Sequence, residues 1–403
     1  MIVNTEGRLP IKIFTDEITD RDRGAIEQAI NLANLPFVYR WPALMPDYHL
    51  GYGMPIGKVM ATQGVVVPNA VGVDIGCGMC ALKTPWTIDD VNVDMLKEIV
   101  GMIRKEVPVG FNKHKKAQPD MPYDGVILHN FDGILEDSVV LAEWENAEIS
   151  LGTLGGGNHF IEVQRDTEGS IWIMIHSGSR NLGTKVAKHY NDLAVTLNTR
   201  YFSGVPKEWE LAFLPIDSYE GENYINEMEY CVEFAFANRK LMMERVAGVF
   251  SSYLKRDELS LDDMINIAHN YARMEHHFGK DVMVHRKGAT SAKRGEVGII
   301  PGSMGTKSYI VRGLGNPESF ESCSHGAGRT MGRNEAKGKK KTERSLNLET
   351  EQKKMEGIVH GLRNVSDLDE APGAYKDIDL VMENQKDLVE ILTELSPLAV
   401  VKG

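Results

Sequence analysis

Cysteine is scarce in this sequence, and so are long apolar runs. Four cysteines among 403 residues are too few for a disulfide framework, so any functional cysteine is expected to act as a thiol or a metal ligand. No stretch approaches the ~18 apolar residues of a membrane span, and the first residues lack the basic and apolar regions of a secretory signal. We therefore expect a cytoplasmic protein with no membrane partner.

Positive charge is also in short supply, with 45 Lys+Arg against 57 Asp+Glu and a formal net charge of -12. Proteins that coat nucleic acid or anionic membranes through net charge usually carry a basic field, so the balance disfavours that class. It does not exclude a local basic groove. Residues 325–344 are one candidate, with seven basic and two acidic side chains, and a solvated loop and a phosphate-facing surface explain this segment equally well.

Both helices and short strands are predicted. Amphipathic periodicity predicts helices at residues 94–107, 135–150, 224–254 and 380–395. Thr87, followed by Asp89 and Asp90, is expected to cap the first of them. Short apolar runs bounded by Gly or Pro predict buried strands at residues 64–68, 172–176, 281–285, 298–301 and 308–313. The elements do not alternate with the period of βαβ units, so we expect a mixed α/β (α+β) fold rather than a doubly wound sheet.

Five of the twelve histidines stand in glycine-rich or strand-end contexts: His49, His159, His176, His269 and His325. Glycine permits tight turns and close approach to a ligand, so these rings are expected on turns rather than on helix faces. Each one alone is more often a hydrogen-bonded structural histidine than a ligand. Five together favour a functional site.

The run VGVDIGCGM places Asp74 and Cys77 three residues apart on a glycine-rich segment. A carboxylate and a thiolate at this spacing can bind one metal or bridge two, with further ligands from His159, His176 and His269. Thiolate and imidazole suit zinc whereas manganese prefers oxygen, so these residue types leave the metal open.

Cys77 and Cys80 also form the run CGMC, which is found in redox pairs and in halves of zinc ribbons. A ribbon needs a second pair, which the remaining cysteines do not supply, and a redox pair would open a helix in a βαβ unit. We therefore assign Cys80 mainly a packing role.

Standard nucleotide-binding motifs fail on inspection. SGSRNLGTK lacks the GK[ST] order of a phosphate loop, and GYGMPIG and GAGRTMG are one residue too long for GxGxxG. No lysine stands in the KxDG arrangement of lysine-based ligases. If the protein activates a nucleotide covalently, its nucleophile is another residue type.

The remaining motifs occur in a fixed order from about residue 36 to the last residue: MPDYHLG, VGVDIGCGM, GGGNHFIE, HSGSR, AHNY, PGSMGTKSY, SHGAGR, AYKDID and VKG. This set resembles the RtcB family of GTP-dependent RNA ligases. The resemblance implies one catalytic domain over residues 1–403, with central sheets flanked by helices and a metal site in a central cleft. The long helical segment, about 222–255, is expected to protrude from it.

The resemblance also implies a reaction. Family members join an RNA 3′-phosphate or 2′,3′-cyclic phosphate end to a 5′-hydroxyl end, in tRNA splicing or RNA repair, using GTP and manganese. The histidine of SHGAGR becomes guanylylated, and in this sequence it is His325. The implied partners are such RNA ends and GTP, with an archease-like activator as a further candidate.

Site residues follow from the same resemblance. Two Mn²⁺ ions would be held by Asp74, Cys77, His159, His176 and His269, with Cys77 bridging them. Asn158 would contact phosphate, and Asp47 would lie near the metals and assist their chemistry. The guanosine pocket would be formed by Glu162, Ser303, Ser308, Gly326, Ala327, Gly328, Tyr375 and Lys402. In that pocket Glu162 can accept hydrogen bonds from N1 and N2 of guanine, which favours GTP over ATP.

Two other functions stay open. A metal-dependent phosphodiesterase or phosphatase acting on RNA ends would need the metal ligands but not His325, Glu162 or Lys402. An inactive protein that binds RNA ends would need no catalytic residues. The presence of every expected type of metal ligand disfavours this function.

Overall fold

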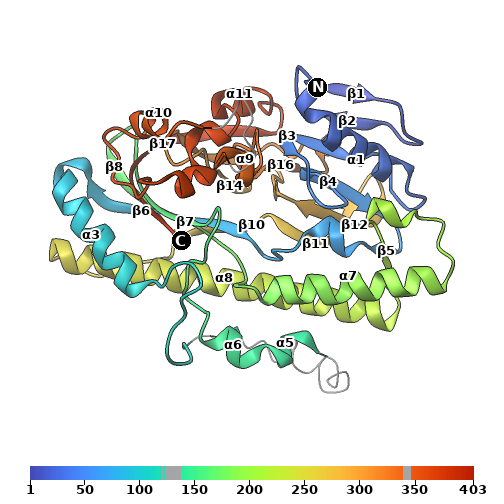
Figure 1. The fold of residues 1–403 in the computed structure, drawn as a ribbon, viewed down its shortest axis with the longest axis horizontal. Coiled ribbons are helices and arrows are strands. Elements are labelled where there is room, and N and C mark those ends of the chain that lie inside the picture. Colours follow the sequence, from blue (N-terminus) through green and yellow to red (C-terminus); the bar gives the residue numbers. More distant parts are fainter. Residues whose placement is uncertain (120, 123–137, 339–345) are drawn as a thin grey trace.

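The computed structural model describes residues 1–119, 121–122, 138–338 and 346–403. Two large β-sheets form its centre, and helices lie along their faces (Figure 1). This arrangement confirms the predicted mixed α/β fold. Within the described residues, no helix is both long enough and apolar enough to cross a bilayer.

The first large sheet has six strands in the order β1-β2-β3-β4-β12-β11. In that order the strands span Ile2–Asn4, Ile11–Ile13, Ala43–His49, Ile56–Thr62, Lys280–Lys287 and Asn270–His277. Its neighbours run antiparallel except for β2 and β3, which run parallel. Small two-stranded sheets pair β13 (Ala289–Ser291) with β16 (Ser322–Ser324), and β5 (Val65–Val66) with β9 (Leu214–Pro215).

The second large sheet has seven strands in the order β10-β6-β8-β7-β17-β15-β14. In that order the strands span Ile265–Ala268, Gly78–Thr87, Ser170–Ser177, Phe160–Asp166, Val389–Lys402, Ser308–Gly313 and Val297–Ile300. All five predicted strands are observed, as β5, β8, β12, β14 and β15.

The α-helices are α1 (Arg23–Asn34), α2 (Pro68–Val71), α3 (Val93–Glu106), α5 (Val139–Ala142), α6 (Trp144–Glu148), α7 (Leu182–Arg200), α8 (Tyr219–Leu254), α9 (Arg333–Ala336), α10 (Leu348–Lys354) and α11 (Ile378–Glu383). The helix predicted at 135–150 is split into α5 and α6, and residues 135–137 lie outside the described part. Thr87 does not cap α3. It forms a capping box with Asp90 on a short 3-10 helix, and the side chain of Asn92 accepts from two amides at the start of α3.

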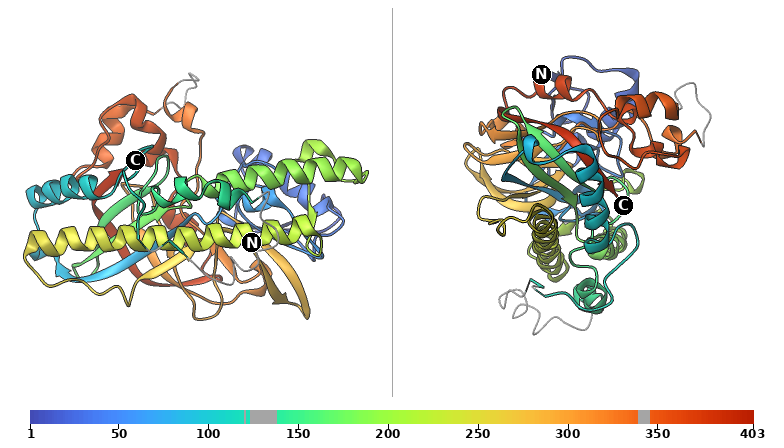
Figure 2. Two further views of the ribbon diagram at one scale, coloured as in Figure 1. Left: turned by 90° about the horizontal axis from the view of Figure 1, so that it is seen from below. Right: turned by 90° about the vertical axis from the view of Figure 1, so that its left-hand side faces the viewer.

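Helix α8 is the longest element, with 36 residues. It runs the length of the molecule beside α7 and beneath the seven-stranded sheet (Figures 1 and 2). The sequence led us to expect a protruding segment, but twenty of its residues are buried, from Gly221 to Ser251. The helix therefore forms part of the body of the fold.

The helix predicted at 380–395 is wrong in its second half. Helix α11 ends at Glu383, and β17 begins at Val389. The apolar spacing of this segment fits a helix face, but β17 pairs with β15 on one side and β7 on the other. Two ladders of backbone hydrogen bonds outweigh the local helix propensity, because a buried strand satisfies its polar groups on both edges.

Side-chain alternation in the seven-stranded sheet separates a core face from a site face. On β8, Ile171, Ile173 and Ile175 pack against α3 and α8, in one cluster with Ile103 and Phe250. Burial of each such side chain contributes about 1.5–3 kcal/mol. Because neighbouring residues of a strand point to opposite faces, the alternate positions, including His176, face the other way.

The same alternation sorts the neighbouring strands. Ile161 on β7 and Val401 on β17 join the core against α3 and α8, whereas Phe160 and Val400 belong to the cluster on the opposite face. Glu162 and Lys402 are therefore on the site face. Cys80 on β6 lies in the α8 core, fully buried, which agrees with its predicted packing role.

Candidate active site

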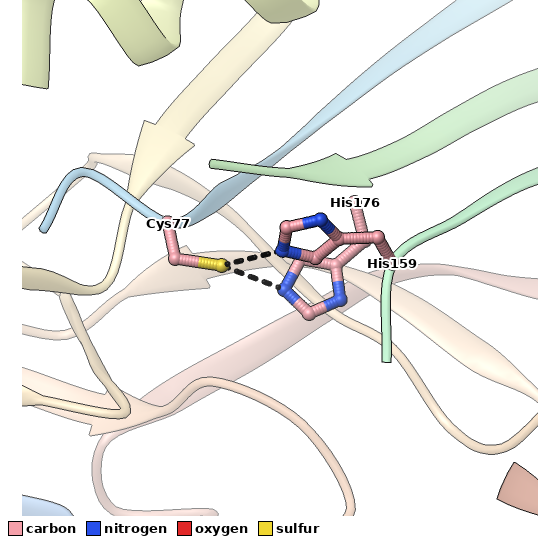
Figure 3. Close-up of side chains that lie close together, drawn as sticks. All are labelled: Cys77, His159 and His176. Atoms are coloured by element: carbon pink, nitrogen blue, oxygen red, sulfur yellow. Dashed lines mark hydrogen bonds between the residues drawn. The ribbon is translucent and has the colours of Figure 1, made fainter. Parts of the chain in front are cut away.

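A thiol and two imidazoles meet where β6, β7 and β8 lie side by side. Sγ of Cys77 lies 3.4 Å from Nε2 of His159 and 3.3 Å from Nε2 of His176 (Figure 3). All three residues are buried, and they form the one group of metal-ligand type found among the described residues. Strand pairing creates the cluster, because His176 pairs with Met79 on β6 and with Phe160 on β7.

Both histidines are oriented by the main chain. Nδ1 of His159 lies 2.9 Å from the carbonyl oxygen of Leu154, and Nδ1 of His176 lies 3.2 Å from that of Asn158. A carbonyl oxygen can only accept, so each Nδ1 donates its hydrogen, and Nε2 of each ring is the atom that can offer a lone pair to a metal. Metal-ligating histidines are held in this way in proteins.

Asp74 extends the cluster. Its Oδ2 lies 3.2 Å from Nε2 of His159. Burial alone would raise the pKa of this carboxyl, but the hydrogen bond and charge of His159 outweigh it and lower the pKa below its ordinary value. Gly178 leaves room for the carboxylate, since a Cβ there would lie 2.6 Å from Oδ1 of Asp74.

His269 lies between this cluster and His325. Its ring centroid is 5.2 Å from that of His176 and 4.8 Å from that of His325. The ring is buried, and its Nδ1 has no hydrogen-bond partner in the described part of the chain. Burial lowers the pKa of His176 and of His269 well below the ordinary value, so both rings are neutral and able to act as ligands.

Burial raises the pKa of the Cys77 thiol well above its ordinary value, and the nearby Asp74 adds to the effect. A thiol in this environment ionises only when a cation is bound next to it. The donor set therefore fits a divalent metal: one buried thiol, one carboxylate, and imidazoles whose Nε2 atoms converge.

His325 follows β16 and is paired with Asp47 from β3. Nδ1 of His325 donates to Oδ2 of Asp47 at 2.6 Å, and the same oxygen accepts from the amides of His325 and Gly326 at 3.1 and 3.3 Å. Asp47 is fully buried. Nε2 of His325 has no hydrogen-bond partner among the described residues, so its lone pair is available to a ligand.

Asp47 was predicted to lie near the metals and assist their chemistry, which stays a prediction. In the structure its hydrogen bonds go to His325, whose ring is 4.8 Å from that of His269, and to Gly326. Gly328 makes this packing feasible, because it has φ of +73° and a Cβ there would lie 2.1 Å from the carbonyl oxygen of Asp47.

A cavity of about 670 Å³ joins the metal-type cluster to His325. The predicted residues that line it are Asp74, Cys77, Asn158, Glu162, His176, His269, Ser303, His325, Gly326, Ala327, Gly328, Tyr375 and Lys402. Asp47, His159 and Ser308 are buried outside its wall, and each contacts a residue that lines it. His49 from the histidine set also lines the cavity, and burial lowers its pKa to about 4.

Glu162 and Lys402 face the cavity from adjacent strands. Burial raises the pKa of Glu162 to about 7, although Lys402 and a hydrogen bond from Gln164 at 2.7 Å oppose the rise. Ser308 accepts from the side chain of Gln164 at 3.1 Å and from the amide of Gly302 at 3.2 Å. It therefore supports the pocket through Gln164.

Sequence reasoning missed Glu370, the acidic centre of this pocket. Its carboxylate lies 3.5 Å from Nζ of Lys402 and 3.3 Å from both Arg329 and Arg333, and it also accepts from the hydroxyl of Tyr375. Burial would raise the pKa of Glu370, but these cations lower it. Glu370 stands five residues before Tyr375 of the AYKDID motif, and nothing in its spacing marked it.

Arg329 and Arg333 also line the cavity, and both belong to the basic segment 325–344. The described part of this segment therefore has two guanidinium groups on the cavity wall. Residues 339–344 lie outside the described part. Asn270 of the AHNY motif and Lys287, which belongs to no motif, are further wall residues, and burial lowers the pKa of Lys287 to about 7.

A buried thiol and imidazole cluster that could hold a metal opens on one cavity with a carboxylate-paired histidine, in a mixed α/β fold. Residues 28–403 match the RtcB family model, described as tRNA-splicing ligase RtcB. The chain belongs to this family of RNA-splicing ligases.

Curated relatives agree with the family match over nearly the full length. The RNA-splicing ligase RtcB of Escherichia coli (strain K12) is 39% identical over 414 residues, covering 99% of this chain and 98% of that protein. The tRNA-splicing ligases RtcB of Thermococcus kodakarensis and Pyrobaculum aerophilum are 34% and 33% identical, each covering 98% of this chain and 95% of the relative.

Proposed function

We propose that this protein joins an RNA 3′-phosphate or 2′,3′-cyclic phosphate end to a 5′-hydroxyl end, through GMP carried on His325. The observation that carries the proposal is the state of this histidine. Asp47 accepts the Nδ1 hydrogen at 2.6 Å, while Nε2 has no partner in the described part of the chain and the ring lines the cavity. This is the arrangement of an activated nitrogen nucleophile.

The chemistry explains why a covalent nucleotide is useful. A 3′-phosphate monoester is dianionic and has no good leaving group. In the proposed sequence Nε2 of His325 attacks the α-phosphorus of GTP and pyrophosphate leaves. The RNA 3′-phosphate then displaces the histidine to form RNA-(3′)pp(5′)G, and the 5′-hydroxyl oxygen attacks the RNA phosphorus with loss of GMP. A cyclic phosphate is first hydrolysed to the 3′-phosphate.

Asp47 acts on the histidine rather than on the phosphates. A carboxylate at Nδ1 keeps the ring in one tautomer and orientation, and it stabilises the positive charge that develops when Nε2 forms a bond. The amides of His325 and Gly326, which bond the same carboxylate oxygen, fix the carboxylate in turn.

The residues that would hold two Mn²⁺ ions are Asp74, Cys77, His159, His176 and His269. The fit rests on the convergent Nε2 atoms of His159 and His176 and on the buried thiol. Divalent ions in such a site neutralise phosphate charge and favour in-line attack. Manganese follows the family resemblance, because a thiolate with imidazoles would also suit zinc.

The guanosine pocket is proposed around Glu162, Tyr375 and Lys402. As a carboxylate, Glu162 accepts from the N1 and N2 donors of guanine, and adenine has no such pair. Glu370 positions Lys402 and Tyr375 for this contact. Ser303, Ala327 and Gly328 complete the wall, and Asn158 is placed to contact a phosphate.

We propose one catalytic unit over residues 1–403, because the cavity draws residues from His49 to Lys402. Its substrates would be RNA ends from tRNA splicing or RNA repair, which places the activity in the cytoplasm. An archease-like protein is proposed as an activating partner on family resemblance alone.

The test is transfer of label from GTP labelled at the α-phosphate, in the presence of Mn²⁺. We expect an acid-labile, alkali-stable adduct on the wild-type protein and none on His325→Ala. A metal-dependent hydrolase acting on RNA ends is the competing function. A wild-type protein that takes no label but hydrolyses a cyclic phosphate would establish the hydrolase instead.

A further inference from the structure

A lysine-rich loop lies beside the cavity, and no motif or catalytic role discussed above accounts for it. Residues 109–118 have the sequence VGFNKHKKAQ, with Lys113, Lys115 and Lys116 and no acidic residue. In a chain with a net charge of -12 this is a local reversal of sign. Such reversals are the electrostatic signature of a surface that contacts phosphates.

Phe111 is the third residue of this loop and precedes its lysines. Its exposed fraction is 104%, the highest of the exposed large apolar side chains in the described part of the chain, compared with 93% for Phe202. A single exposed aromatic ring is ordinary. A ring just before a run of lysines on a fixed loop is different, because it offers a flat apolar face and positive charge together.

The loop is held to the body of the protein at both ends. The amide of Gly110 donates to the carbonyl oxygen of Gly155 at 2.8 Å, and Val109 forms a parallel β-bridge with Gly155. The amide of His114 donates to Ile149 at 2.9 Å, and Arg245 donates to Nε2 of His114 at 2.7 Å. The ring of Phe111 is therefore presented on an ordered support, which reduces the entropy lost on binding.

The anchor of the loop is also part of the active-site segment. Gly155 comes three residues before Asn158, whose side chain lines the cavity, so the two Cα atoms are at most about 11 Å apart. Gly403, directly after Lys402, also lies against the carbonyl oxygen of Gly155. The figures agree, with the segment that follows α3 passing close to the C-terminus (Figures 1 and 2).

We propose that residues 109–118 form a binding element for single-stranded RNA, in which Phe111 stacks on an unpaired base and Lys115 and Lys116 contact its phosphates. This inference rests on the proposed function, because it supplies the contact for the RNA strand beyond the reacting end. The loop is anchored at Gly155, at most about 11 Å from Asn158 on the cavity wall, so a strand that leaves the reacting end can reach the loop.

The chemistry favours a single strand over a duplex or a protein. An unpaired base has a free π-face that an aromatic ring can cover whatever its sequence, and a paired base does not. Lys113 is engaged with the side chain of Asn146, so Lys115 and Lys116 are the lysines assigned to phosphate.

The test is the affinity of the full-length chain for an unstructured RNA of about 12 nucleotides, measured by fluorescence anisotropy without GTP. We expect Phe111→Ala to raise Kd roughly tenfold, and Phe111→Trp to restore most of the affinity. The Kd for a duplex of the same sequence should change less on Phe111→Ala. Lys115→Ala with Lys116→Ala should lower the slope of log K against log salt by about 1.4.

Phe202→Ala is the matched control, since its ring is equally exposed but lies beyond the end of α7. That helix starts near the cavity at Leu182 and has nineteen residues, which places Phe202 about 28 Å away. We expect wild-type RNA affinity for this control. The midpoint of thermal unfolding should be unchanged in both alanine variants, because neither ring is packed.

Wild-type RNA affinity in Phe111→Ala overturns the inference, including the case in which the loop binds an acidic protein instead. An equal loss in Phe202→Ala overturns it as well. Its failure is distinguishable from failure of the proposed reaction. If RNA affinity depends on Phe111 but the protein never carries GMP, only the ligase mechanism is refuted. If the protein carries GMP and Phe111→Ala keeps wild-type RNA affinity, only the role of the loop is refuted.

Discussion

Asp47 accepts the Nδ1 hydrogen of His325 at 2.6 Å, although the two residues are 278 positions apart in the chain. Asp47 comes from the six-stranded sheet, and His325 follows a strand of a separate small sheet. The pair converts an ordinary imidazole into one with a fixed tautomer and an exposed lone pair. The proposed covalent step depends on this contact.

Asp47→Asn should therefore slow the transfer of GMP to His325 by about 10²-fold or more. The amide keeps the size of the side chain and an acceptor for the two backbone donors, but it removes the negative charge that stabilises the cationic ring. The rate is measured as initial incorporation of α-labelled GMP. Asp94→Asn, an exposed change in the first turn of α3, is the control, and equal rates in the two variants would contradict the role of Asp47.

Cys77→Ala and Cys80→Ala should have different effects, because Cys77 is the proposed metal ligand and Cys80 is a packing residue. Sγ of Cys77 faces His159 and His176, so its loss should abolish binding of at least one metal ion and GMP transfer with it. Cys80 points into the core beside α8, and burial raises its pKa to about 12, so its loss should cost about 1 kcal/mol of stability and leave the metal in place. Metal content after gel filtration is the measurement. Equal loss of metal in both variants would favour a paired-cysteine site.

The affinity for GTP should depend on pH through Glu162. Burial raises its pKa from 4.5 to about 7, so below that pH the free protein holds a neutral carboxylic acid that cannot accept from both guanine donors. Kd for GTP should therefore fall as pH rises to about 7 and then level off. Nucleotide titrations between pH 5.5 and 8, roughly, should show this curve.

Glu162→Gln is the paired test of that pH dependence. The variant should bind GTP more weakly, discriminate less against ATP and lose the dependence near pH 7. The same proton uptake predicts that wild-type stability falls by roughly 3 kcal/mol as pH rises from 4.5 to 7, since the folded state binds the proton more tightly than the unfolded state. An unchanged pH profile in Glu162→Gln would assign the dependence to another group.

Glu370→Gln should weaken GTP binding about tenfold, or about 1.4 kcal/mol. The carboxylate holds Lys402, Tyr375 and two arginines in place, and an amide cannot balance their charge. Binding is measured by calorimetric titration with GTP. Asp369→Asn is the neighbouring control, because the carboxylate of Asp369 pairs with Lys337, and its contact with Arg329 is through the backbone carbonyl, which the substitution keeps. A loss confined to protein stability, with wild-type GTP affinity, would reduce Glu370 to a structural residue.

Local sequence signals were sufficient where an element is stabilised mainly by its own pattern. The helix at 94–107 and the strand at 172–176 were predicted within a few residues, because periodicity and short β-branched runs are local properties. The signal failed at β17, where Leu388, Ile391 and Leu395 also fit a helix face. Pairing with β7 and β15 decided the outcome there, and no local pattern reports it.

The sequence by itself determined which residue types carry the chemistry, because the glycine-rich motifs around Asp74, Cys77, His159, His176 and His325 are readable without coordinates. Only the tertiary structure decided how they are combined. The period of two along β7, β8 and β17 placed Glu162, His176 and Lys402 on one face. Long-range packing set Asp47 against His325 and Glu370 against Lys402. These pairings form because separate elements pack around one cavity. Sequence spacing does not report the distance between residues that are far apart in the chain.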